Sequence, residues 1–316
     1  IRPLVSHPSA VWKQYIWPQK AMTQFGGWVA STPMGVVTTL IIRDFVRRYG
    51  VDMMEAEQPH VAAYTTFNAF FTRALRAGVR PIGSADWVSP VDGAVSQLGD
   101  IDAGHIFQAK GHSYSAQALL ACEPHEAQAF EFGQFATIYL SPKDYHRIHM
   151  PCAGTLTRMA YVPGDLFSVS PVTAAHVPGL FARNERVVCW FDTDHGPLVM
   201  VLVGATIVGS MATIWHGTVN PPRSTTSQDW RYEAGTISLE QGAEMGRFML
   251  GSTVVWLWPS VAATAEQRLR FEPTWQATSV VRLGQSMAHL QPLASPAHGS
   301  GRGLRRGDYH RSLSHI

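Results

Sequence analysis

The spacing of the apolar positions changes near residue 80. Upstream of it the spacing is helical, and the clearest example runs from Ile41 to Tyr49. Its apolar arc consists of Ile41, Ile42, Phe45, Val46 and Tyr49, and its polar arc consists of Arg43, Asp44, Arg47 and Arg48. This pattern predicts an amphipathic helix. A second helix is predicted to begin at Thr66, with its apolar faces formed by Phe67, Phe70, Phe71 and Leu75.

Between about residues 80 and 260, the apolar residues form short continuous runs separated by glycine and proline. The runs are Thr137–Leu140, Val187–Phe191, Val199–Val203 with an extension over Ala205–Val208, and Val254–Leu257. Runs of this length and punctuation are typical of strands. We therefore predict an α+β fold with a β-rich, mostly antiparallel domain and an N-terminal helical region.

These patterns divide the chain into three segments. Residues 1–78 form the helical region and residues 79–290 form the β-rich domain. Residues 291–316 are rich in Ser, Gly, Arg and His and lack apolar periodicity, so they are predicted to be a disordered tail.

Composition adds a possible lipid surface to this picture. Charged residues make up only 15% of the chain, which also holds ten Trp and 14 Phe. The most apolar run, Trp28 to Ile42, is too short to span a bilayer and contains Pro33 and Gly35. Amphipathic helices with basic and aromatic residues lie in the membrane interface. The pattern along the first 78 residues therefore predicts either a membrane-associating region or helices that pack on the protein itself.

Charge and cysteine content exclude several classes of function. A net charge of +2 gives no electrostatic case for binding nucleic acid. The three cysteines, Cys122, Cys152 and Cys189, are scattered and form no Cys-x-x-Cys pair. This spacing argues against a disulfide framework and against a structural zinc site, and it fits a reducing compartment. No clear secretory signal is seen.

The segment from Ser141 to Pro151 carries two neighbouring histidines. Ser141 can cap a helix and Pro142 suits a first helical position, so a short helical turn is predicted. His146 and His149 would then share one face. They could be hydrogen-bonded core residues, a metal pair or acid–base groups, but the sequence offers no further ligands in a recognised metal pattern, so no metal is expected.

Two further segments have both a plain and a chemical interpretation. Asp92, between Pro90 and Gly93, is typical of a turn, and its alternative role is the carboxylate that orients a histidine. Gly251-Ser252-Thr253, entering an apolar run, is likewise typical of a turn. Taken alone, each segment favours the plain interpretation.

In combination, the three segments closely resemble the bacterial phosphatidylserine decarboxylase family. The resemblance extends over most of residues 25–285 and includes Gln108–His112, Tyr161–Val169, Leu180–Arg186 and Val203–Ser210. It implies that Ser252 is the nucleophile that cleaves the chain after Gly251, giving a β chain of residues 1–251 and an α chain of residues 252–316. It also implies that His149 is the base for cleavage with Asp92 behind it, and that His146 serves in decarboxylation.

The implied chemistry suits these residue types. A neutral imidazole can activate a serine hydroxyl, and a buried carboxylate steadies the imidazolium that forms. Ser252 would attack the Gly251 carbonyl, and elimination with loss of ammonia would leave a covalent pyruvoyl group. This group would hold the amine of phosphatidylserine as a Schiff base and accept electrons as CO2 leaves to give phosphatidylethanolamine.

The resemblance further implies a peripheral enzyme on the cytoplasmic face of the cell membrane. Its partners would be the phosphatidylserine substrate, the membrane surface and its own two cleaved chains, and the resemblance also implies a homodimer. One alternative is a lipid-surface serine hydrolase that uses Asp92, His149 and Ser252 repeatedly, although a Gly-x-Ser-x-Gly elbow is missing. A second is a non-catalytic, membrane-bound β-rich module. A third, a pyridoxal phosphate enzyme, would need Lys110 or another lysine, and nothing around Lys110 marks a phosphate site.

Overall fold

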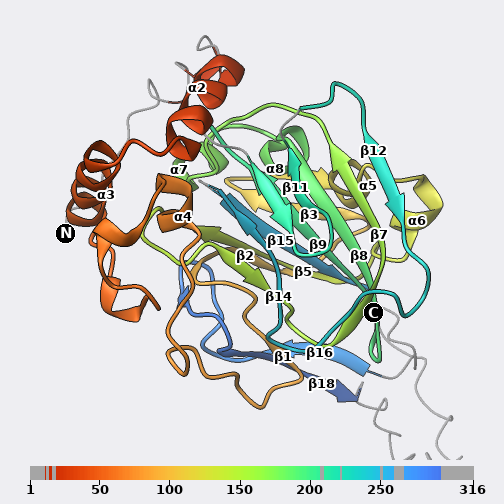
Figure 1. Ribbon diagram of the computed structural model, residues 1–316. Coiled ribbons are helices and arrows are strands. Elements are labelled where there is room, and N and C mark those ends of the chain that lie inside the picture. Colours follow the sequence, from red (N-terminus) through yellow and green to blue (C-terminus); the bar gives the residue numbers. More distant parts are fainter. Residues whose placement is uncertain are drawn as a thin grey trace, which may run out of the picture.

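The computed structural model describes residues 11, 14–15, 19–206, 210–220, 223–249, 252–259 and 267–292. The N-terminal part is helical (Figure 1). Its helices are α2 (Gln19–Ser31), α3 (Val36–Tyr49) and α4 (Phe67–Phe71), with the 3-10 turns η1 (Met53–Glu55) and η2 (Val61–Ala63) between α3 and α4. Thr66 caps α4 as predicted, its hydroxyl accepting from the Ala69 N–H at 3.1 Å. Leu75 lies beyond the end of α4.

A large antiparallel sheet forms the centre of the molecule. Its strands are β2 (Gly93–Asp100), β5 (Gln134–Leu140), β7 (Gly154–Val162), β8 (Arg186–Thr193), β9 (Gly196–Gly204), β12 (Gln228–Arg231), β13 (Ser238–Leu239), β15 (Ser252–Trp258) and β17 (Val280–Val281). The order is β12-β7-β8-β9-β15-β5-β2-β17, and β13 also pairs with β7. The prediction of a β-rich, antiparallel α+β fold is confirmed. Strand β9 ends at Gly204, so Ala205 and Thr206 of the predicted extension are not part of it, and residues 207–208 lie outside the described residues.

Smaller sheets and short helices cover the two faces of this sheet. The additional strands are β1 (Trp87–Val88), β3 (His105–Ala109), β4 (His112–Ser115), β6 (Arg147–His149), β10 (Met211–Thr213), β11 (Gly217–Asn220), β14 (Glu244–Phe248), β16 (Gln267–Phe271) and β18 (Ser286–Pro292). The additional helices are α5 (Ala116–Leu120), α6 (Pro124–Gln128), α7 (Pro171–Ala174) and α8 (Leu180–Arg183). The smaller sheets have the strand orders β11-β10-β14-β6, β1-β18-β16 and β3-β4.

The strand runs are apolar throughout because both faces of the central sheet are buried. Along β15, Val254, Trp256 and Trp258 join one core with residues of β1, β6, β10 and β14. Val255 and Leu257 point to the other core, which α5, α7 and α8 complete. A strand buried in this way is held on every side, so its first residue has a fixed position.

The helical region has a small core of its own. Ile42, Phe67, Phe70 and Phe71 are buried there, with Phe45 and Val46 packed against them. The arc predicted to face a membrane is therefore partly used within the protein. Apolar residues next to that arc remain exposed on α2 and α3: Phe25, Trp28, Val36, Val37 and Leu40.

The helical region lies beside one end of the central sheet (Figure 1). In the part of the chain that the structure describes, no single helix is long and apolar enough to cross a bilayer. Residues Ala21–Ser31 and Val36–Tyr49 reach that length and composition only together, and they are bent by 113° at the break between them. Of the predicted tail, the structure describes only residues 291–292, which belong to β18. The segment boundary near residue 78 stays a prediction.

Close packing of β2 on β5 yields a testable expectation about Gly93. A Cβ at Gly93 would lie 2.5 Å from the carbonyl oxygen of Tyr139, so neither backbone has room for it. Gly93→Ala should lower the free energy of unfolding by about 1–3 kcal/mol, as overpacking does. Urea denaturation measures this change. Gly27→Ala is the control, because a Cβ there meets nothing within 4 Å and α2 should tolerate it. Equal midpoints for the Gly93 variant and the parent protein would contradict the expectation.

Candidate active site

Ser252 is the first residue of β15 and lies between two neighbouring strands. Its Cα partners are Leu140 at the end of β5 and Gly204 at the end of β9. The side chain is fully buried, and its hydroxyl has no hydrogen-bond partner among the described residues. A buried polar group left unpaired costs about 1–3 kcal/mol, so such a group calls for an explanation. The hydroxyl of the next residue, Thr253, is buried and unpaired among the described residues as well. The chain just before it, Leu250 and Gly251, lies outside the described residues.

His146 is held beside the strand that leads toward Ser252. Its backbone carbonyl accepts from the N–H of Phe248, four residues before Ser252. Its ring Nδ1 lies 2.8 Å from the Asp144 carbonyl oxygen. A carbonyl can only accept, so Nδ1 carries the proton and Nε2 presents a lone pair. Nε2 is buried and has no hydrogen-bond partner.

The surroundings of His146 keep its imidazole neutral. The ring packs on Phe71 with their centroids 4.1 Å apart. Burial lowers the pKa of His146 to about 3, and the positive charge of Arg73 acts in the same direction. The hydrogen bond to the Asp144 carbonyl opposes this shift. His146 is therefore an uncharged base whose Nε2 meets no hydrogen-bond donor among the described residues.

His149 has a different set of partners. Its Nδ1 lies 2.7 Å from the Gly242 carbonyl oxygen, so here too Nδ1 carries the proton. Its Nε2 lies 3.1 Å from the hydroxyl of Tyr145. Burial raises the pKa of Tyr145 to about 12, so this hydroxyl stays protonated and donates to His149. Burial lowers the pKa of His149 as well, against the opposing effects of Gly242, Glu244 and Asp92.

The prediction of a helical turn across the two histidines is wrong. Residues Arg147–His149 form strand β6, which pairs with β14, and His146 lies in the loop just before it. Residues 72–73, which are distant in the sequence, bind this segment through two hydrogen bonds and hold it in an extended form. The Arg147 Nε donates to the Thr72 carbonyl at 2.8 Å, and an Arg73 terminal nitrogen donates to the Lys143 carbonyl at 3.2 Å. The two imidazoles therefore have separate surroundings and share no helical face.

Asp92 lies in the bend just before β2, and its carboxylate is fully engaged. Arg80 donates to both oxygens at 2.6–3.2 Å, and the Leu283 N–H donates to Oδ1 at 2.8 Å. Glu55 accepts a further bond from Arg80 at 2.6 Å. No hydrogen bond joins Asp92 to His149 among the described residues. Asp92 acts on His149 through its charge, which favours the protonated imidazole.

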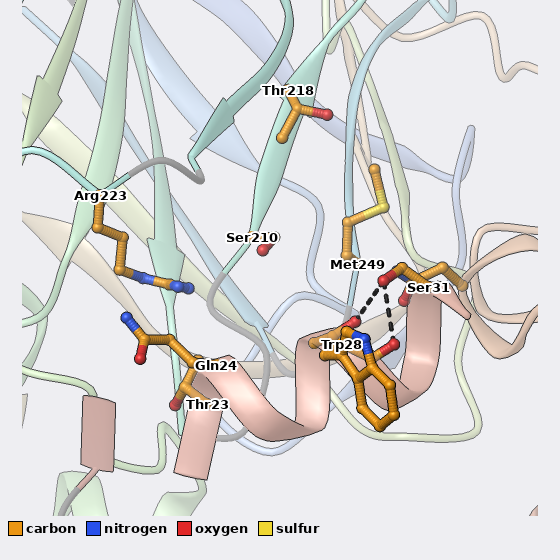
Figure 2. Close-up of a pocket in the computed structure, with 10 residues that line it drawn as sticks. Thr23, Gln24, Trp28, Ser31, Ser210, Thr218, Arg223 and Met249 are labelled. Atoms are coloured by element: carbon orange, nitrogen blue, oxygen red, sulfur yellow. Dashed lines mark hydrogen bonds between the residues drawn. The ribbon is translucent and has the colours of Figure 1, made fainter. Parts of the chain in front are cut away.

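Two cavities flank α2 near these residues. The first has a volume of about 630 Å³ and is shown in Figure 2. Its lining residues are Thr23, Gln24, Gly27, Trp28, Ser31, Asn68, Ser210, Thr218, Arg223 and Met249. Met249 lies three residues before Ser252, and its N–H donates to the Ser210 carbonyl at 3.0 Å. This cavity therefore lies beside the segment that enters β15.

The second cavity, of about 480 Å³, lies on the other side of α2 and is mostly apolar. Phe25, Val29 and Phe45 contribute to it, as does Phe71, the residue that packs on His146. Trp28 in the first cavity and Phe25 in the second are both exposed at the surface of α2. Both cavities therefore reach the exposed apolar surface of the helical region.

Comparisons with known proteins show which family the chain belongs to. A family model described as "Phosphatidylserine decarboxylase" matches residues 67–289, and one described as "PSD" matches residues 9–50. The chain belongs to the phosphatidylserine decarboxylase family. It is 63% identical over 279 residues to a phosphatidylserine decarboxylase proenzyme of Delftia acidovorans, covering 88% of this chain and 96% of that protein. A proenzyme of the same name from Variovorax paradoxus is 60% identical over 289 residues, or 92% of this chain and all of the relative.

Several residues near this site of the decarboxylase-family chain were not predicted from the sequence. Tyr145 adjoins His146 in the motif, so its place in the run was a usable signal. Arg73 and Arg80 carried no such signal, because each reaches its partner across 12 or more positions of the chain. Within the described ranges, no group of three or more His, Cys, Asp or Glu side chains is arranged to hold a metal ion.

Burial of neutral His146 predicts how stability depends on pH. In the unfolded chain the pKa of histidine is near 6.5. In the folded protein the pKa of His146 is about 3. Between these values the unfolded state binds a proton that the folded state does not. Stability should therefore fall as the pH drops below 6.5, by up to about 1.4 kcal/mol per pH unit from this residue.

Urea unfolding of the parent protein and of His146→Gln, at several pH values between about 7 and 5, tests this expectation. The variant should lose less stability on acidification. His125→Gln, at an exposed position on α6, is the control for removing an imidazole. Parallel losses of stability in the parent and in His146→Gln would show that His146 is not the source.

Proposed function

We propose that this chain is the proenzyme of a phosphatidylserine decarboxylase that cleaves itself before Ser252 and converts that residue to a pyruvoyl group. The observation that carries the proposal is the buried, unpaired hydroxyl of Ser252 at the start of β15. The family and the relatives named proenzymes support it.

The surroundings of Ser252 fit the conversion to a pyruvoyl group. Since the Ser252 hydroxyl makes no hydrogen bond to any described residue, its loss by elimination breaks no such bond. The backbone of β15 stays paired with β5 and β9 on both sides. These neighbours would hold the pyruvoyl group at a fixed place. The group would supply a keto function that binds a primary amine and accepts electrons during loss of CO2.

The proposed self-cleavage gives separate roles to Ser252, His149 and Asp92. The Ser252 oxygen attacks the Gly251 carbonyl carbon, the peptide nitrogen leaves, and an ester forms. Elimination then releases a carboxylate on Gly251, and addition of water with loss of ammonia completes the conversion. We assign the base for this sequence to His149, whose Nε2 lone pair already faces the hydroxyl of Tyr145, with Asp92 stabilising the imidazolium through its charge.

His146 is assigned to proton transfer during decarboxylation. Its Nε2 is unprotonated and has no partner that would compete for a substrate proton. Phe71, beside its ring, also lines the second, mostly apolar cavity, and the His146 side chain is itself fully buried. An uncharged imidazole in such a place can accept a hydrogen bond from the substrate amine and relay a proton to the product carbanion.

We further propose that the protein works at the cytoplasmic face of the cell membrane, with the exposed apolar residues of α2 and α3 in the lipid interface. From Trp28 to Ile42 the sequence holds no charged residue, and Arg43, Arg47 and Arg48 follow at once. Apolar residues flanked by basic ones suit the headgroup region. Both cavities reach this surface, so a lipid could enter them without leaving the membrane.

Mass measurement of the purified protein tests self-cleavage. The parent chain should separate into residues 1–251 and a C-terminal piece that is lighter than residues 252–316 by one ammonia. Ser252→Ala should stay as one chain without decarboxylase activity, because it lacks the nucleophile. Thr253→Ala, at the next buried position, is the matched control and should be processed. An active parent protein that remains a single chain would indicate the serine hydrolase alternative or another mechanism.

Replacing Val36 and Leu40 by aspartate tests the membrane proposal. Both side chains are exposed, so the double variant should fold and cleave itself normally. Binding to vesicles of anionic lipid should fall at least tenfold, because buried apolar area drives interfacial binding. Phe132→Asp, which alters an equally exposed apolar residue just after α6, should bind as the parent does. Vesicle co-sedimentation measures both, and unchanged binding of the double variant would rule out this surface.

A further inference from the structure

The first cavity, the larger of the two beside α2, has one charged side chain among its described lining residues. That side chain is Arg223, and the remaining lining consists of hydroxyl, amide, apolar and glycine positions. Figure 2 shows the Arg223 guanidinium and the Gln24 amide approaching each other from opposite walls. A cation in the wall of a cavity whose described lining residues include no carboxylate favours an anion there. We propose that Arg223 binds the phosphodiester of the substrate headgroup and that Glu185 positions the Arg223 guanidinium. This inference rests on the proposed function.

Glu185 is built into the fold as a support for Arg223. Its side chain is 3% exposed and accepts from the Arg223 Nε at 3.1 Å. The Tyr161 hydroxyl donates to its other oxygen at 2.8 Å, and Asn220 donates to the oxygen that Arg223 uses. Glu185 is not part of the cavity wall, so its negative charge lies behind the guanidinium. The cavity is therefore lined by the cation and not by the carboxylate.

The same residues link Arg223 to the cleavage strand. The carbonyl of Glu185 accepts from the Gly204 N–H at 2.8 Å, and Gly204 is the Cα partner of Ser252. The side chain of the adjacent Asn184 donates to the Gly204 carbonyl at 2.9 Å. The anion-binding group and Ser252 are thus fixed on one rigid framework. A headgroup held at Arg223 would have a constant position relative to the pyruvoyl group.

The phosphodiester is a better partner for Arg223 than the carboxylate of the serine moiety. That carboxylate loses its charge as CO2 leaves. A guanidinium bound to it would stabilise the ground state more than the transition state and would slow the reaction. The charge of the phosphodiester does not change during the reaction. Binding it adds affinity without this penalty, and Arg is well suited to phosphate oxygens.

The test compares self-cleaved Arg223→Gln with the self-cleaved parent protein in detergent micelles that contain phosphatidylserine. We expect KM to rise by roughly tenfold or more while kcat changes little, since the lost interaction is uniform binding. Glycerophosphoserine should inhibit the parent protein far better than free serine does, because serine lacks the phosphodiester. Arg223→Gln should lose that preference. Arg231→Gln, which removes an exposed arginine from β12, is the matched control and should behave as the parent.

Three outcomes would overturn the proposal. In the first, KM and inhibition by glycerophosphoserine are unchanged in Arg223→Gln. In the second, kcat alone falls, which would place Arg223 in the chemical step. The third outcome applies if Arg223→Gln fails to fold or cleave. In that case Gln24→Glu is the test variant, because it places a negative charge opposite Arg223 from an exposed helix position. An unchanged KM in Gln24→Glu would overturn the proposal. A parent protein without cleavage or decarboxylase activity would instead refute the proposed function, and this inference with it.

Discussion

Burial of β15 on both faces and along both edges is the constraint on which the site depends. Two cores pack on its side chains, and β5 and β9 hold its backbone. Ser252 therefore starts a strand that cannot shift, and its hydroxyl is left without a partner. On the proposed mechanism, the stability of this strand offsets the cost of the unpaired hydroxyl. It also keeps the residue in place after the chain breaks.

The two histidines differ because their surroundings differ, although both are neutral with the proton on Nδ1. His146 faces Phe71 and has no partner for Nε2, whereas His149 accepts from Tyr145 and feels the charge of Asp92. A positive charge is easier to form on His149 than on His146. This difference supports assigning the transient imidazolium of self-cleavage to His149 and the second proton transfer to His146.

The helical region joins the lipid-facing surface to the chemistry. Its small core contacts the imidazole of His146 through Phe71. The side of α2 that lines the larger cavity faces Arg223, and the exposed apolar residues of α2 and α3 lie near the mouths of both cavities. A headgroup could thus meet the half-buried cation of Arg223 while its chains remain in an apolar setting. The same helices would then serve membrane contact and substrate entry.

The sequence determined the fold class, the main strands and the amphipathic helix, because apolar periodicity reflects which faces are buried. It also determined the candidate residues Ser252, His149, His146 and Asp92, through motifs whose order resembles a known family. Tertiary structure alone decided that the histidine segment is a loop and a strand, since contacts from residues 72–73 override the local helical preference. It likewise decided that Arg80 engages Asp92 and that Ile42 turns inward. Contacts with residues distant in sequence determine these outcomes, and the local sequence pattern does not indicate such contacts.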